Sequence, residues 1–176
     1  FLLVGIYMLI FGNYDKSVKI FMILWFLIVA IPASVTNDVP HFITIPTTAG
    51  TGSEVGRSAI IADDQTHQKK ILFSPKLLAK MVFADPLLTM ELPAFITAAT
   101  GMDALTHNME AFLAKNYHPI CDGIALEGIR LIAGAIEKAV KNPDLSSRSD
   151  MLLASIMGAI AFQKGLGVVH SLDRKS

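Results

Sequence analysis

The pattern of apolar and polar positions changes character at about residue 39. From there, short apolar runs alternate with turn residues, and beyond Pro93 apolar residues recur at helical spacing. We expect strands at 41–46, 57–62, 71–73 and 81–83, followed by helices at 94–115, 120–140 and 149–164. The predicted fold class is therefore an α/β part followed by an all-α domain.

Two apolar runs, Phe1–Phe11 and Ile20–Ile31, dominate the first 38 residues. Each is shorter than the roughly 20 residues of a spanning helix, and neither has the basic start of a signal peptide. Two buried core elements, a membrane hairpin and an aberrant reading frame all remain open as interpretations. We treat residues 1–38 as a separate segment and expect no membrane partner, because runs of this length are more often buried elements.

Composition limits the function classes. Fifteen basic and 15 acidic residues cancel, so no net charge favours nucleic-acid binding. Hydrophobic residues make up 52% of the 176, which is ample for a core. The single Cys121 excludes an internal disulfide, fits a reducing compartment and so predicts a cytoplasmic location. Without a basic neighbour in sequence, it is expected to be a packed thiol.

The loop Thr47–Ser53 is the first candidate for chemistry. Its small residues allow a ligand to approach the backbone closely, and its hydroxyls and N–H groups suit a phosphate oxygen. A plain turn between two strands explains the same residues equally well, because no Walker or G-x-G-x-x-G pattern is present.

Asp103 and His107 are the second candidate, because four residues place them one turn apart on one helix face. A carboxylate and an imidazole there can share a divalent cation, with Glu110 as an outer partner. The alternative is a hydrogen bond between Asp103 and His107 with a solvated Glu110, since two ligands alone do not fix a metal site. His170 follows an apolar, glycine-rich stretch, where a metal or a backbone carbonyl are both suitable partners.

Four motifs occur together in a fixed order: Ile45–Val55, Ala84–Pro86, Thr100–Ala111 and Gly165–His170. In this order and spacing, the chain from about Pro40 to Leu172 resembles the iron-containing alcohol dehydrogenase family. The resemblance implies an incomplete α/β nucleotide-binding domain at 39–90 and the first part of a helical metal-binding domain at 91–176. This architecture is shared with dehydroquinate synthase-like proteins, and the active site lies in the cleft between the two domains.

The resemblance also implies roles for individual residues. Contacts to the dinucleotide, NAD or NADP, would come from Thr47, Thr48, Thr51, Lys70 and Leu88. The metal, Fe²⁺ or in some members Zn²⁺, would be held by Asp103, His107 and His170, with no catalytic residue beyond this site. An alcohol or aldehyde is the implied substrate, and homo-oligomerisation is left open for the full-length protein.

Several departures from the family pattern lead us to expect a fragment. Residues 1–34 lack the Gly-Gly-Gly-Ser phosphate loop, and the fourth metal ligand, a histidine, lies past Ser176. Arg174 stands where a proton-relaying histidine is usual, and Gly56 replaces a threonine near the cofactor. We therefore expect the 176-residue chain to be inactive by itself. A polyol dehydrogenase of the same superfamily and an inactive membrane-associated remnant are the alternative interpretations.

Overall fold

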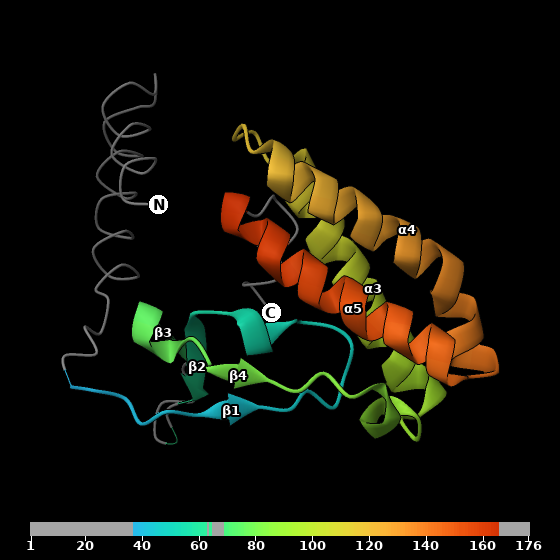
Figure 1. Cartoon of the computed structure of the whole chain (residues 1–176), viewed down its shortest axis with the longest axis horizontal. Coiled ribbons are helices and arrows are strands. Elements are labelled where there is room, and N and C mark those ends of the chain that lie inside the picture. Colours follow the sequence, from blue (N-terminus) through green and yellow to red (C-terminus); the bar gives the residue numbers. More distant parts are fainter. Residues whose placement is uncertain (1–36, 63, 65–68, 166–176) are drawn as a thin grey trace. The chain divides into compact units, whose positions relative to one another are not determined.

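The computed structural model describes residues 37–62, 64 and 69–165 (Figure 1). The apolar segment 1–36, for which the sequence allowed three interpretations, lies outside the described residues. Within the described part, no helix has both the length and the apolar character that crossing a bilayer requires. The described residues form two compact units: one contains 37–39 and Arg57–Leu77, the other Pro40–Gly56 and 78–165.

The first unit contains an antiparallel pair of strands, β2 (Ser58–Ala62) and β3 (Lys69–Phe73). Ser58 lies opposite Phe73 and Ala62 opposite Lys69. The predicted strand 57–62 is confirmed to within a residue, and β3 begins two residues before the predicted 71–73 because its pairing with β2 continues to Lys69. A short 3-10 turn, η2 (Pro75–Leu77), follows.

The second unit opens with two short parallel strands, β1 (Ile43–Thr44) and β4 (Met81–Val82). Hydrogen bonds from Lys80 N–H to the Phe42 carbonyl and from Phe83 N–H to the Thr44 carbonyl extend the pairing at either end. The predicted strand 41–46 is thus in the right place but shorter. Its far end is limited by Pro46, which has no N–H to donate to a neighbouring strand.

Three helices form most of the second unit: α3 (Ala94–Leu113), α4 (Pro119–Lys141) and α5 (Leu145–Ala161), which pack on one another (Figure 1). All three were predicted, but α5 begins four residues early. The Asp144 side chain accepts a hydrogen bond from Ser147 N–H, and the Ser147 hydroxyl accepts one from Asp144 N–H, which makes a capping box. The expected end at 164 belongs to a separate 3-10 turn, η4 (Phe162–Lys164).

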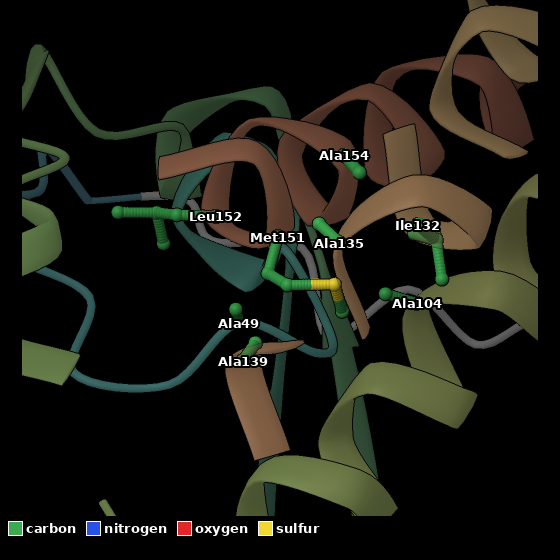
Figure 2. Close-up of a cluster of buried hydrophobic side chains, with 8 residues drawn as sticks. All are labelled: Ala49, Ala104, Ile132, Ala135, Ala139, Met151, Leu152 and Ala154. Atoms are coloured by element: carbon green, nitrogen blue, oxygen red, sulfur yellow. The ribbon is translucent and has the colours of Figure 1, made fainter. Parts of the chain in front are cut away.

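Small side chains dominate the core between the helices. Figure 2 shows this cluster, which joins the 47–53 loop to all three helices: Ala49, Ala104, Ile132, Ala135, Ala139, Met151, Leu152 and Ala154. Small residues let helix backbones approach closely, so the unit gains contact area without bulky side chains.

A buried amide lies where the three helices meet. Asn108 on α3 is fully buried, and its Nδ2 donates to the Ala104 carbonyl at 2.9 Å and the Ala154 carbonyl at 3.0 Å. Glycines leave room for it: a Cβ on Gly128 of α4 would lie 2.1 Å from Asn108 Oδ1, and one on Gly158 of α5 would lie 2.7 Å from Nδ2. Asn108 therefore connects α3 to α5 through a space that larger residues would close.

A buried arginine fixes the other end of α5. Arg148 donates from Nη1 to Thr97 Oγ1 at 2.7 Å and from Nη2 to the Leu92 carbonyl at 3.2 Å. Burial lowers the pKa of Arg148. These bonds hold the start of α5 against the first turn of α3 and the chain after η3 (Pro86–Thr89).

Candidate functional site

The loop from Thr47 to Ser53 buries its alanine and glycines and exposes its threonines. Ala49, Gly50 and Gly52 are buried, whereas its three threonines are exposed. A Cβ on Gly50 would lie 2.9 Å from Thr100 Cβ of α3. Gly52 has φ of 62°, and a Cβ there would lie 2.5 Å from the Ser155 carbonyl oxygen of α5. The glycines thus serve close packing of the loop on α3 and α5, a reason that the sequence alone did not show.

The exposed side of this loop borders a hollow. A pocket of about 320 Å³ is lined by residues 44–48 and 51–54, including Thr47, Thr48 and Thr51. Threonine hydroxyls both donate and accept hydrogen bonds, so this wall suits a polar ligand such as part of a dinucleotide. The three loop residues predicted to contact the cofactor therefore share one pocket.

Glu54 is a residue of this pocket that the sequence analysis did not single out. It lies in the 3-10 turn η1 (Ser53–Val55), only 7% exposed, and its Oε1 has no hydrogen-bond partner in the described part of the chain. Burial raises the pKa of the Glu54 carboxyl, and a hydrogen bond to its own backbone offsets this in part. In the sequence, Glu54 stands out only as one acidic residue in a stretch of small, uncharged residues.

Asp103 and His107 come together on one face of α3, as predicted. Their Oδ1 and Nε2 atoms lie 3.9 Å apart, which is too long for a hydrogen bond. Two ligands of one cation stand at about 2.1 Å each from it, so atoms up to about 4 Å apart can share it. The imidazole is 5% exposed and the Asp103 side chain 41%. The pair therefore fits two ligands of a cation that is reached from the Asp103 side.

The His107 ring lies beside an aromatic side chain. Its ring packs on Phe162 of η4, with 5.4 Å between ring centroids and an interplanar angle of 57°. Glu110, three residues further on, is buried, so the solvated Glu110 of the alternative interpretation is wrong. In the ranges that the structure describes, no group of three or more metal-binding side chains is present. The predicted third ligand, His170, lies outside the described residues.

Two other predicted cofactor contacts, Lys70 and Leu88, are not among the described residues that line this pocket. Lys70 lies in β3 opposite Ile61, in the first unit, and its side chain is outside the described part of the structure. Leu88 lies in η3 and is half exposed. Its N–H donates to the Asp85 carbonyl at 3.2 Å. The roles of both residues stay predictions.

Two further residues have structural roles. His118 is exposed and caps α4, its Nδ1 accepting a hydrogen bond from Cys121 N–H at 3.3 Å. Cys121 is a buried free thiol, as expected for a packing residue. A partly buried ion pair between Lys164 and Asp122 was missed, because the two residues are 42 positions apart in the chain.

Comparison with known proteins places this geometry in a family. The model of the iron-containing alcohol dehydrogenases matches residues 13–86, and the model of the C-terminal part of the Fe-containing alcohol dehydrogenase family matches residues 97–175. The 4-hydroxybutyrate dehydrogenase of Cupriavidus necator is 50% identical over 142 residues, which are 80% of this chain and 37% of that protein. The 1,3-propanediol dehydrogenase of Klebsiella pneumoniae is 40% identical over 79% of this chain and 36% of its own length.

Solved structures agree on the fold. A crystal structure of 1,3-propanediol oxidoreductase matches 81% of this chain and 38% of its own, with a TM-score of 0.75 and 40% identity. The alcohol dehydrogenase from Oenococcus oeni matches 95% of this chain and 42% of its own, with a TM-score of 0.77 and 33% identity. The chain spans a little over a third of the length of these curated relatives. Sequence and fold agree: the chain belongs to the iron-containing alcohol dehydrogenase family.

Proposed function

We propose that this chain is part of a metal-dependent dehydrogenase that transfers hydride between an alcohol and a nicotinamide cofactor. The observation that carries the proposal is the Asp103–His107 pair, 3.9 Å apart on α3 within the stretch that matches the family's C-terminal model. The domain limits stay part of the proposal: 39–90 as the end of the dinucleotide-binding domain and 91–176 as the first part of the metal-binding domain. A cytoplasmic location also stays a prediction.

In this proposal, different residues of the chain bind the metal and the cofactor. Asp103 contributes a negatively charged oxygen ligand, and the buried ring of His107 a neutral nitrogen, with His170 as the third ligand. The chemistry that a divalent cation supplies in such a site is to lower the pKa of an alcohol. The hydroxyls of Thr47, Thr48 and Thr51 bind the polar part of the dinucleotide, which holds the nicotinamide within reach of the substrate carbon.

The functions of relatives support the choice of cofactor and metal. One relative is an NAD-dependent methanol dehydrogenase from Bacillus methanolicus, and a sulfoacetaldehyde reductase of the same fold was solved in complex with NAD⁺. They support NAD over NADP, and the family description supports Fe²⁺ over Zn²⁺.

Relatives also suggest the substrate class. Two of them act on 4-hydroxybutyrate and on 1,3-propanediol. Both molecules are primary alcohols with a second polar group at the far end of a short carbon chain. We propose substrates of this class. The polyol alternative within the same superfamily is compatible with the diol-acting relative.

The metal-binding half of the proposal is tested with Co²⁺, whose visible absorption reports its ligands. Asp103→Asn and His107→Ala variants of the chain are titrated beside the unmodified chain, with His118→Ala as the matched histidine control. We expect each ligand variant to bind Co²⁺ more than about tenfold more weakly, because even lost outer partners cost about 10–100-fold. Unchanged affinity in His107→Ala, or equal loss in His118→Ala, would contradict the proposal.

A further inference from the structure

Lys164 is a buried charge that the proposed mechanism does not use. Its side chain is 3% exposed, and its Nζ forms an ion pair with Asp122 in the first turn of α4. The same Nζ donates to the Phe112 carbonyl near the end of α3 at 3.2 Å. Asn116, between α3 and α4, donates from Nδ2 to the Lys164 carbonyl at 2.8 Å. The turn η4 is thus tied to both neighbouring helices and to the loop between them.

This turn also forms part of the wall around the candidate metal ligand. Phe162, two residues before Lys164, packs its ring on the His107 imidazole. Any shift of η4 moves that ring against the imidazole of His107.

Stability alone does not account for a buried lysine here. Taking the Lys164 ammonium out of water costs free energy, and its attraction to Asp122, whose side chain is 30% exposed, often does no more than offset that cost. Lys164 therefore favours a positioning role. Three directional polar contacts restrict where η4 can lie more than apolar packing would.

We propose that Lys164 is a positioning residue of the metal site: its bridge from η4 to Asp122 and the Phe112 carbonyl holds Phe162 against the His107 ring and so fixes the ring's direction toward Asp103. This inference rests on the proposed function, because it assigns a purpose to the orientation of a metal ligand.

The test separates positioning from stability with four variants of the full chain. Lys164→Met breaks the bridge and leaves Asp122 unpaired, whereas the double variant Lys164→Met with Asp122→Leu removes both charges. Arg148→Met breaks the buried contacts at the opposite end of α5 and serves as the control for lost helix anchoring. Lys164→Arg keeps the positive charge. Co²⁺ affinity, the Co²⁺ absorption spectrum and Tm are measured for each.

We expect Lys164→Met to weaken Co²⁺ binding about 10–100-fold and to change the absorption spectrum, as the loss of an outer support does. The double variant should recover Tm but not Co²⁺ affinity, and Lys164→Arg should recover part of the affinity. Arg148→Met should lower Tm and leave the spectrum of the folded protein unchanged.

Recovery of Co²⁺ affinity in the double variant would overturn the inference, and so would an equal loss in Arg148→Met. If Lys164→Met does not fold, the double variant still decides between the two roles. Co²⁺ binding in the unmodified chain that does not depend on Asp103 and His107 would overturn the proposed function, and this inference with it.

Discussion

Several polar side chains are buried in the described part of the chain, and Glu54 is the one among them that lines the threonine pocket. Asn108 and Arg148 each donate hydrogen bonds to carbonyls of a neighbouring segment. Each also leaves one buried atom, Asn108 Oδ1 and Arg148 Nε, without a hydrogen-bond partner in the described residues, as Glu54 does with Oε1. Burial of the Glu54 carboxyl carries a desolvation cost that the hydrogen bond to its own backbone offsets only in part. Glu54 is therefore the residue whose replacement is most informative about the pocket.

Glu54→Gln should stabilise the chain at neutral pH. Because burial raises the folded-state pKa of Glu54 above its ordinary value of about 4.5, the protonated carboxyl is favoured in the folded state. Its contribution to stability is complete below that value and is lost as the pH rises through the folded pKa. We expect the variant to gain about 1 kcal/mol at pH 7, the low end for an unsatisfied buried group, because residual solvent contact screens the cost.

Thermal unfolding at neutral pH and again below the ordinary carboxyl pKa checks this prediction. The difference between Glu54→Gln and the unmodified chain should vanish at the acidic end. Glu91→Gln, at an exposed position, provides the matched control and should differ little at either pH. A gain in stability that is equal at both pH values would contradict the titration argument.

At the level of elements, helix α4 contains one glycine in a crowded place and one in an open place. Gly128 faces Asn108 so closely that an added Cβ would meet its Oδ1, whereas Gly134 has nothing within 4 Å of an added Cβ. Both are helical, so both carry the same entropic penalty relative to alanine. Only the space around them differs.

Alanine at these two positions should therefore change stability in opposite directions. Gly128→Ala should lower the free energy of unfolding by about 1–3 kcal/mol, the usual cost of overpacking. Gly134→Ala should raise it by up to about 1 kcal/mol through helix propensity alone. Urea unfolding of the two variants measures both values, and two changes of the same sign would show that the Asn108 contact does not limit the packing.

The elements themselves were largely predictable from the sequence. Helical spacing gave α3 and α4 nearly to the residue, because tertiary packing uses the same apolar faces that the pattern shows. The start of α5 was misplaced since Leu145–Arg148 look polar, although the spacing from Asp144 to Ser147 is that of a capping box. In the site, local spacing predicted Asp103 with His107. Pairing of Lys164 with Asp122 depends on how distant helices pack, which no local pattern reports.

At the level of the whole molecule, the described residues contain two parts of the proposed active site. The chain spans a little over a third of the 4-hydroxybutyrate and 1,3-propanediol dehydrogenases, and the two parts are the candidate metal pair and the threonine pocket. Metal ligands and cofactor contacts act together, so an incomplete set loses much more than its share of activity.

The isolated 176-residue chain should accordingly show no alcohol oxidation above background. The assay follows NADH formation from 1,3-propanediol with NAD and Fe²⁺ or Zn²⁺, and the Klebsiella pneumoniae 1,3-propanediol dehydrogenase serves as the positive control. Turnover by the isolated chain that disappears in His107→Ala would contradict the prediction and show that these residues suffice.

In the loop Thr47–Ser53, packing on the helices and lining of the pocket fall to different residues. Its buried glycines and Ala49 determine how the backbone sits on α3 and α5, while Thr47, Thr48 and Thr51 face outward. Substitutions at the three threonines therefore change the pocket wall and leave the packing beneath it intact. A methyl group at Gly52 would instead collide with α5. The loop would have to move away from the helix, and all three threonines would move with it.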